Sequence, residues 1–311
     1  MSIYFRERSI CAICGSSQRK VHRAFRDIPV VQCSECGFLY SSRIMAEETI
    51  QSYYRENFGS QRHLEGQCVN AASNAVVLRK LLNLRAFRSW LDIGTGYGFL
   101  LKWLREEYDL ETDGVELSLQ ESIYARDRLG LRIHSTPLSQ ARLQKGHYDV
   151  VSLFEVIEHI PDPISFIKEI AEYVNPGGIL VIMTDNFESK IVKMLRGSFP
   201  KWIPHTHVSH FAPESLRRCI KSVPGLTMEA EASYSPLDLV GRQILSVLRP
   251  PIPDEQAYDL RTALGSEMNR NYRFYHIRRK MNPMWARVTL RNTLDRGALM
   301  YGVCRKRPAF S

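Results

Sequence analysis

From residue 85 onward, segments of two kinds alternate along the chain. Short segments that are apolar throughout, such as residues 90–93 and 148–154, have the pattern of buried strands. Amphipathic segments such as residues 99–107 and 163–174 follow them and have the pattern of helices. Apolar strands that alternate with helices indicate a parallel sheet covered on both faces, so this region is predicted to be α/β.

The remaining segments extend this pattern in both directions. Further strands are predicted at residues 30–32, 38–40, 112–116, 132–134, 179–183, 226–234 and 297–304, and further helices at 68–84 and 119–129. A helical stretch separates the last two strands and is interpreted as an insertion. We therefore expect five parts: residues 1–43, a helical linker at 44–84, a core at 85–235, a basic helical insertion or lid at 236–296, and a last core strand with the tail at 297–311.

Two CxxC pairs define the first of these parts. Cys11 and Cys14 form one pair, and Cys33 and Cys36 form the other. Each pair directs two thiolates to one point, and four thiolates complete a tetrahedral zinc site. A segment this small cannot bury enough apolar surface to fold alone, so we predict a zinc ribbon stabilised by structural zinc. The ribbon either serves as a scaffold or holds substrate against the next part.

The charge of the 311-residue chain is unevenly distributed. The formal net charge is +9, with Lys/Arg and Asp/Glu balanced at 22 each over residues 61–253 and 12 against 5 over residues 254–311. The basic end indicates either an anionic or membrane-surface partner or a solvated helical surface. With no secretory signal or membrane-spanning run evident, we expect a cytoplasmic protein, peripheral at a membrane surface if the basic insertion binds one.

A glycine-rich loop lies between the first core strand and the first core helix. Gly94, Gly96 and Gly98 follow Asp92 in the pattern DxGxGxG, which permits a tight turn and close approach of a ligand to the backbone. Position 99 is Phe, whereas a nicotinamide-dinucleotide loop requires glycine there. Glu116, at the end of the second core strand, is placed to accept hydrogen bonds from both hydroxyls of a ribose.

These residues resemble the class I S-adenosylmethionine-dependent methyltransferases over roughly residues 85–235. The matching segments are 92–98, 114–118, 148–160 and 175–180. The resemblance implies a doubly wound, mostly parallel seven-stranded Rossmann-like sheet and S-adenosylmethionine as cofactor. It implies a cofactor site in which Gly94 and Gly96 face the methionine portion and Glu116 the ribose. In the same way it places Phe154 and Glu155 on the methionyl side and Leu117 and Leu138 near the adenine.

The ribbon, the Tyr53-Tyr54 segment and the histidine-rich segment 205–216 together resemble the bacterial sugar C-methyltransferase-like subfamily. A hydroxyl or acidic carbon acceptor needs a base, and His207, His159, Tyr54 and Tyr53 are the candidates. The tyrosines equally suit an aromatic patch that packs the linker, and the histidines equally suit packing. Glu158 faces either solvent or the site. The histidine segment alone does not indicate a metal, because no matched carboxylate or thiolate ligands adjoin it.

The favoured function is therefore methyl transfer to a small or carrier-linked acceptor, above all a nucleotide- or lipid-linked sugar or glycan. One alternative is an RNA methyltransferase in which the ribbon binds RNA. The nearly neutral ribbon argues against nucleic acid, because binding to phosphates favours dense Lys and Arg. The other alternative is a non-catalytic cofactor-binding scaffold, which the intact glycine loop and Glu116 disfavour.

Overall fold

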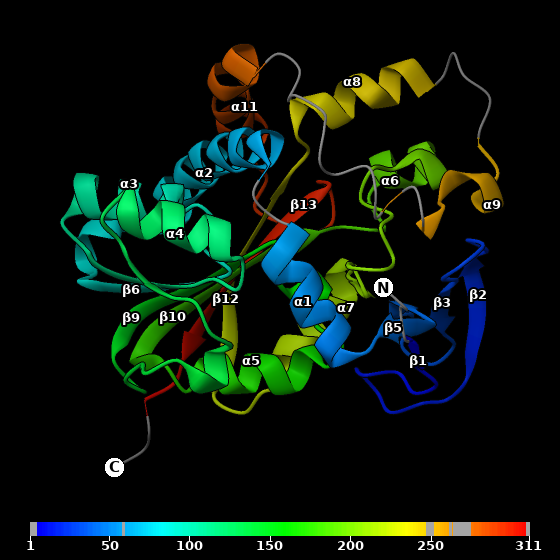
Figure 1. The fold of residues 1–311 in the computed structure, drawn as a ribbon, viewed down its shortest axis with the longest axis horizontal. Coiled ribbons are helices and arrows are strands. Elements are labelled where there is room, and N and C mark those ends of the chain that lie inside the picture. Colours follow the sequence, from blue (N-terminus) through cyan, green and yellow to red (C-terminus); the bar gives the residue numbers. More distant parts are fainter. Residues whose placement is uncertain (1–4, 58–59, 247–251, 261–262, 264–274, 309–311) are drawn as a thin grey trace.

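A seven-stranded mixed sheet forms the centre of the chain in the computed structural model (Figure 1). The structure describes residues 5–57, 60–246, 252–260, 263 and 275–308. Five neighbouring strands are parallel, and β13 runs antiparallel to both β10 and β12. The predicted Rossmann-like sheet is thus confirmed. In spatial order its strands are β12 (Leu226–Tyr234), β13 (Leu299–Lys306), β10 (Val174–Asp185), β9 (Tyr148–Phe154), β6 (Ser89–Ile93), β7 (Glu111–Val115) and β8 (Arg132–His134).

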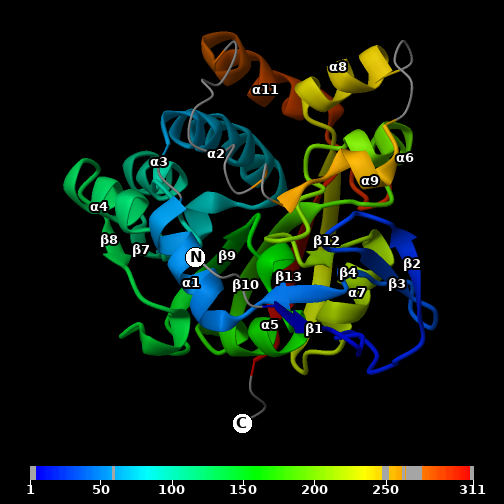
Figure 2. The same ribbon diagram turned by 45° about the vertical axis from the view of Figure 1, so that its right-hand side comes forward.

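Helices cover both faces of this sheet, as the apolar strands predicted (Figures 1 and 2). Side chains at alternate strand positions enter different clusters, so that Trp90 packs towards one layer and Leu91 towards the other. The first layer contains α2 (Gln61–Leu81), α3 (Phe99–Tyr108) and α4 (Leu119–Asp127); the second contains α5 (Pro163–Ala171) and α7 (Pro213–Lys221).

Local signals set where these helices begin. The Ser118 side chain accepts a hydrogen bond from the backbone N–H of Glu121 and caps α4. Asp162 caps α5 in the same way, and Pro163 occupies its first turn. The α4 helix therefore starts directly after the turn that follows β7, whereas a short 3-10 helix, Ile157–His159, separates β9 from α5.

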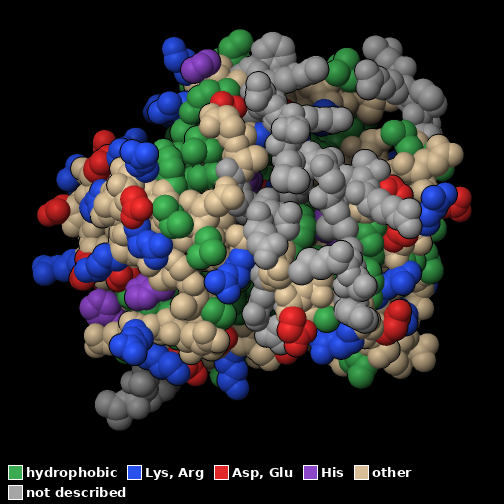
Figure 3. All heavy atoms as spheres, viewed as in Figure 1, with side chains coloured by type: hydrophobic (Ala, Val, Ile, Leu, Met, Phe, Trp, Pro, Cys, Tyr) green, Lys and Arg blue, Asp and Glu red, His purple; other side chains and the backbone are tan. Residues whose placement is uncertain are grey.

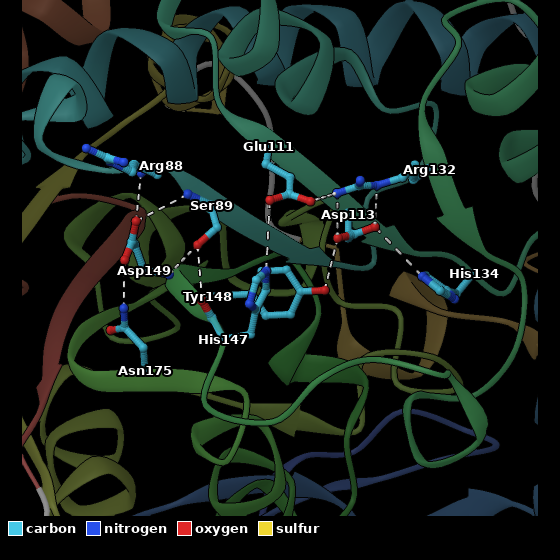
Figure 4. A network of polar contacts seen from close by, with 10 residues as sticks. All are labelled: Arg88, Ser89, Glu111, Asp113, Arg132, His134, His147, Tyr148, Asp149 and Asn175. Atoms are coloured by element: carbon cyan, nitrogen blue, oxygen red, sulfur yellow. Dashed lines mark hydrogen bonds and ion pairs between the residues drawn. The ribbon is translucent and has the colours of Figure 1, made fainter.

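A polar network holds the opposite, amino-terminal edge of the sheet together (Figure 4). Asp149 accepts hydrogen bonds from the backbone N–H groups of Arg88 and Ser89, at 2.7 and 3.2 Å, and from the Asn175 amide at 2.6 Å. Arg132 pairs with Asp113, which also accepts from the Tyr148 hydroxyl at 3.0 Å. These contacts fix the strand ends that lie away from the glycine loop.

The cysteine region forms a second, four-stranded antiparallel sheet. Its order is β11-β4-β3-β2, made of Ser209–His210, Leu39–Ser41, Val30–Cys33 and Arg19–Arg23. The first of these strands, β11, comes from the histidine-rich segment of the core, and Ser209 pairs with Tyr40. Buried Arg8 reinforces the junction, because its guanidinium donates to the carbonyl of Val208 at 2.6 Å. The ribbon is consequently built partly from a distant part of the chain.

The segment between ribbon and core differs in detail from the expected helical linker. It begins with β5 (Arg43–Met45), which pairs with β1 (Phe5–Glu7), and continues through α1 (Glu47–Asn57) into α2. The second helix starts at Gln61, earlier than the predicted residue 68, because Ser60 caps it. This longer helix carries additional side chains to the glycine loop.

The bounds of two later strands, β10 and β13, also differ from those predicted from the sequence. The fifth core strand starts at Val174 rather than at residue 179, since residues 175–178 form a bulge that opposes Asp149 of β9. The last strand runs Leu299–Lys306 rather than 297–304. The backbone of Gly297 lies against Tyr234, where a Cβ would approach the Tyr234 nitrogen to 2.3 Å.

The insertion contains α8 (Leu237–Ser246), α9 (Asp254–Ala257) and α11 (Tyr275–Thr289), and α11 lies against α2. Basic and acidic side chains are interspersed on the left of the face in Figure 3, which agrees with the balanced charge of the core. Within the described residues, no helix has both the length and the apolarity needed to cross a membrane.

Candidate active site

The glycine loop between β6 and α3 adopts left-handed backbone conformations, which favour glycine, at three positions. Gly94, Gly96 and Gly98 have φ angles of +72°, +56° and +76°. A Cβ at Gly94 would lie 2.4 Å from Cγ2 of Val156, and one at Gly96 would lie 2.0 Å from Oε1 of Gln67. The loop thus forms a backbone cradle beside the carboxyl ends of β6 and β9, where the cofactor is expected.

Glu116 lies directly against this cradle. Its carboxylate accepts hydrogen bonds from the backbone N–H groups of Gly96, at 2.8 Å, and Ser118, at 2.7 Å. Burial, followed by the charge of Glu121, raises the pKa of Glu116 to about 7. The residues present therefore fit S-adenosylmethionine: the Glu116 carboxylate, predicted to bind the ribose, lies beside a glycine-rich loop whose backbone a ligand can approach closely.

Asp92 supports the loop from beneath. Its carboxylate accepts a hydrogen bond of 2.5 Å from the Ser152 hydroxyl, which itself accepts from the Trp90 indole N–H at 2.7 Å. The side chain is only 4% exposed, and burial raises its pKa to about 7. Asp92 of β6 is thus hydrogen-bonded to Ser152 of β9, directly before the glycine loop, and can fix the conformation of that loop.

Three polar residues that sequence reasoning missed surround the same loop. Gln67 on α2 accepts from the backbone N–H of Tyr97 at 2.8 Å and donates to Glu121 at 3.1 Å. His63 lies one turn earlier, with Nδ1 2.6 Å from the Glu121 carboxylate. Two signals could have found them: the four-residue spacing of His63 and Gln67, and the Ser118-x-x-Glu121 capping pattern.

The other predicted cofactor residues occupy two environments. Leu117 is half-buried next to Glu116, and Leu138 is buried in the core cluster that contains Val115. Phe154 packs against the cluster of Tyr234 and Tyr301, under α2. Leu117 thus adjoins Glu116 along the chain, while Leu138 and Phe154 contribute to hydrophobic clusters of the core; the adenine role of the two leucines stays a prediction.

Glu155 directly follows β9 and has an unusual backbone conformation. Its φ angle is +56°, which is uncommon for a residue with a side chain and is often found at functional sites. Its carboxylate accepts from the Asn70 amide at 2.9 Å and forms an ion pair with Lys201. Burial opposes ionisation of Glu155, but the Lys201 ammonium outweighs it and keeps the pKa below its usual range.

Three of the four candidate bases converge just beyond Glu155. The Tyr54 hydroxyl lies 2.7 Å from Nδ1 of His159, and the same nitrogen lies 3.1 Å from the carbonyl oxygen of Thr206. The His207 ring meets the His159 ring edge to face, with centroids 4.7 Å apart. Burial lowers the pKa of His159 to about 4 and that of His207 well below its usual value, so both imidazoles are neutral.

Tyr53 and the other two histidines point to different surroundings. Tyr53 meets the ring of His205 edge to face, and His205 Nδ1 lies 3.0 Å from the Tyr258 hydroxyl of the insertion. His210 is fully buried between Phe187 and Trp202. Their contacts indicate packing roles that join the insertion, the ribbon and the core.

Buried carboxylates, which the sequence did not place, adjoin the two converging histidines. Glu158 is fully buried, so the solvent-facing interpretation of this residue is wrong. It accepts a hydrogen bond from the Thr184 hydroxyl at 2.9 Å, and Asp185 at the end of β10 is equally buried. Burial raises the pKa of Glu158 to about 8 and that of Asp185 to about 7. Buried carboxylates and imidazoles thus form two overlapping polar groups, which share Glu158, near the carboxyl ends of β9 and β10.

The four N-terminal cysteines form a compact cluster. Their sulfur atoms all lie within 4.8 Å of one another, with Sγ atoms of Cys11 and Cys36, and of Cys14 and Cys33, 3.5 Å apart. A tetrahedral zinc with Zn–S bonds of about 2.3 Å places its sulfurs roughly 3.8 Å apart. The donor set and spacing therefore fit zinc.

The basic insertion is described in part. Arg270 and Arg273, which contribute to the predicted lid, lie outside the described residues. Arg278 pairs with Asp238 of α8 at 2.9 Å, while Arg279 and Lys280 are exposed. One side of α11 also exposes four large apolar side chains: Ile277, Met281, Met284 and Val288.

The chain is similar to several known proteins. A ubiquinone biosynthesis O-methyltransferase of Yersinia pestis is 26% identical, over 58% of this chain and 72% of that protein. A methyltransferase solved with the Trm112 activator of Haloferax volcanii shares the fold at 16% identity and a TM-score of 0.51, covering 83% of this chain and 97% of that one. A methyltransferase from Thermotoga maritima aligns at 16% identity with a TM-score of 0.48, over 84% and 95%.

The family profile described as "Methyltransferase domain" matches residues 61–228, more than half of the chain. The matched region contains the glycine loop, Glu116 and the converging histidines. The chain belongs to this family and is an S-adenosylmethionine-dependent methyltransferase.

Proposed function

We propose that the protein transfers a methyl group to a small or carrier-linked acceptor, and that this acceptor is a nucleotide- or lipid-linked sugar or glycan. The observation that carries the proposal is the polar character of the region beyond Glu155. Carboxylates, a lysine and imidazoles gather there: Glu155, Glu158, Asp185, Lys201, His159 and His207. A site built from hydrogen-bonding groups selects acceptors that satisfy them and rejects those that leave them unpaired.

The donor side of the reaction follows from the glycine loop. Bound S-adenosylmethionine would supply an electrophilic methyl group, with Gly94 and Gly96 against its methionine portion and Glu116 against its ribose. Placement of donor and nucleophile in line can contribute roughly 7–11 kcal/mol to catalysis. The main task of the chain is then to hold the acceptor in line and to receive its proton.

The neutral imidazoles of His159 and His207 are the proposed proton acceptors, and Tyr54 supports them. A hydroxyl acceptor near His207 would pass its proton to the neutral imidazole pair, and the Tyr54 hydroxyl, 2.7 Å from His159, orients that ring. General-base assistance of this kind typically contributes 10²- to 10⁴-fold. Tyr53 has a packing role in this proposal, because its ring faces His205.

A quinone-type acceptor is the second candidate. The Yersinia relative is named for ubiquinone biosynthesis, and α11 exposes Ile277, Met281, Met284 and Val288 beside Arg279 and Lys280. An apolar stripe flanked by cations is typical of helices that lie on anionic membranes. Such a contact would bring the site close to a lipid-soluble acceptor.

We further propose structural zinc at the four cysteines. We also propose the division of the chain into a ribbon, a linker, a core, an insertion and a tail, with boundaries after residues 43, 84, 235 and 296. The cysteine spacing supports the metal. The insertion supplies Tyr258 to the histidine segment, which supports its role as a cover over the acceptor side.

A screen with isotopically labelled methyl donor tests the acceptor class. Nucleotide sugars, lipid-linked glycans, quinone precursors and RNA are offered separately to the wild type and to the Gly96→Asp variant, which blocks the cradle. We expect label in a sugar or glycan with wild type only. Label in quinone precursors or RNA instead would refute the sugar proposal, and label unchanged by Gly96→Asp would refute the cofactor site.

A further inference from the structure

A second buried carboxylate, Glu121, lies on the donor side of the molecule. It belongs to the first turn of α4, is 2% exposed, and contacts two side chains of α2. Methyl transfer breaks the bond between sulfur and the methyl carbon and leaves the electron pair on sulfur, so the sulfonium donor becomes a neutral thioether. We propose that Glu121 is a specificity-determining residue that favours the cationic donor over this product. The proposal rests on the proposed donor site at the glycine loop.

Gln67 connects Glu121 to the glycine loop. Its amide nitrogen lies 3.1 and 3.2 Å from the two carboxylate oxygens of Glu121, and its amide oxygen accepts a hydrogen bond from the backbone N–H of Tyr97. A Cβ at Gly96 would lie between 2.0 and 2.6 Å from three atoms of this amide, so glycine at this position leaves room for Gln67. Gly96 is expected to face the methionine portion of the donor, which carries the sulfonium. A single side chain thus separates Glu121 from Gly96.

Helix capping does not account for the contacts of Glu121. In a capping box, the glutamate at this position accepts a hydrogen bond from the backbone N–H of the capping residue, here Ser118. That N–H donates to Glu116 at 2.7 Å instead, while the Ser118 hydroxyl accepts from the backbone N–H of Glu121 at 3.3 Å. The Glu121 carboxylate contacts α2, and the N-terminal turn of α4 favours its ionised form. Its negative charge therefore lies between the two helices, next to the glycine loop.

Neither lysine nor arginine offsets the charge beside the loop. Among the described residues, Glu116 and Glu121 form no ion pair with these residue types, and the basic group that contacts Glu121 is His63, with Nδ1 at 2.6 Å. Burial, followed by the charge of Glu121, raises the pKa of Glu116 to about 7, as expected for two interacting carboxylates. Such a pair in a buried region repels itself and attracts a cation. A sulfonium gains this attraction, and a thioether does not.

The charge of Glu121 would thus act on the exchange of product for donor. Before transfer, the carboxylate attracts the positive sulfur and strengthens donor binding. After transfer the sulfur is neutral, so the same carboxylate gives the product no such advantage. The structure therefore assigns to Glu121 an effect on the relative affinity for the two ligands, which hydrogen bonding to Gln67 alone would not produce.

Calorimetry of the full-length protein with S-adenosylmethionine and, separately, with S-adenosylhomocysteine tests this role. The decisive quantity is the dissociation constant of the product divided by that of the donor. Glu121→Gln keeps the size of the side chain and an oxygen that accepts from Gln67, and it removes the charge. We expect the ratio to fall about fivefold or more, because charges in a buried site interact strongly. Glu121→Asp, which keeps the charge, should retain more of the wild-type ratio.

Two further variants serve as controls. Asp127 is exposed at the other end of α4, so Asp127→Asn removes the same charge from the same helix. Solvent and salt screen that position, and the ratio should equal the wild-type value. His63→Gln removes a ring that, when protonated, competes with the donor for Glu121. This variant should not lower the ratio, and a fall would contradict the proposal.

The proposal stays testable if Glu121→Gln does not fold. Gln67→Lys leaves the glutamate in place and sets a cation beside it, so the ratio should fall here too. A wild-type ratio in Glu121→Gln or in Gln67→Lys would overturn the proposal, and so would an equal fall in Asp127→Asn. Failure of the donor site itself has a different signature: no donor binding by the wild type, or donor binding that Gly96→Asp does not weaken.

Discussion

A methyl group added at Gly96 should weaken both the folded state and the binding of S-adenosylmethionine. Its φ is +56°, and a Cβ there would lie 2.0 Å from Oε1 and 2.6 Å from Cδ of Gln67. A left-handed backbone costs an L-residue about 1–2 kcal/mol. Displacement of Gln67 breaks its hydrogen bonds with Tyr97 and Glu121, which adds about 1–3 kcal/mol. Gly96→Ala should therefore lower the free energy of unfolding by about 2–5 kcal/mol.

Gly146 provides the matched control. It lies in an exposed turn before β9 with φ +67°, and a Cβ there would meet no atom within 4 Å. Gly146→Ala thus has the backbone penalty of about 1–2 kcal/mol without the collision. A second comparison adds Gln67→Ala to Gly96→Ala, which makes room for the methyl group and should recover part of the lost stability.

Denaturant unfolding and calorimetry with S-adenosylmethionine measure both effects. We expect Gly96→Ala to bind the donor more than about tenfold more weakly, since 1.4 kcal/mol corresponds to a factor of ten. Gly146→Ala should bind it as wild type does. Equal losses of stability in the two glycine variants, or wild-type donor affinity in Gly96→Ala, would refute the assignment of this loop as a closely fitted cofactor cradle.

Four further predictions concern separate parts of the molecule. The affinity for S-adenosylmethionine should rise between pH 6 and 8, because the pKa of Glu116 is raised to about 7 and only its carboxylate form accepts hydrogen bonds from both ribose hydroxyls. Calorimetry should show this rise in the wild type and a flat pH profile in Glu116→Gln. Tyr54→Phe should lower kcat about tenfold or more with unchanged donor affinity, and an unchanged kcat would exclude the hydroxyl from the proton path. Cys33→Ser should lose about one zinc per chain by elemental analysis, and equal metal content in both proteins would contradict a zinc site. Replacement of Arg279 and Lys280 by Gln should weaken binding to anionic vesicles and spare donor binding; an equal loss of donor binding would show that the helix is structural.

Short-range patterns in the sequence predicted much of the fold and of the donor site. The strand at 148–154 and the strand at 226–234 appear with the predicted bounds, since continuous apolar runs and β-rich composition are local properties. The glycine loop and Glu116 are likewise close in sequence, and they meet through a hydrogen bond. The two CxxC pairs converge because each knuckle is a local turn.

The acceptor side depends on contacts that no local pattern encodes. His159 and His207 meet only because the segment before β11 folds back over the end of β9. Asp185 and Lys201 join Glu155 from a different strand and loop, and their sequence neighbours give no sign of this. The burial of Glu158 could not be predicted, because a polar residue that follows a strand has the same sequence pattern whether its side chain faces water or a buried cluster.

Strand β11 makes the ribbon and the catalytic part mutually dependent. A truncation after residue 43 would leave β4 with an open edge and remove the partner of the segment that carries His207. If the proposed zinc orders the ribbon, a chain that has not acquired it is expected to retain the donor cradle but to lack an ordered acceptor side. Chelators should then inhibit turnover without competing with either substrate, and the ribbon should not be exchangeable between family members unless β11 is exchanged with it.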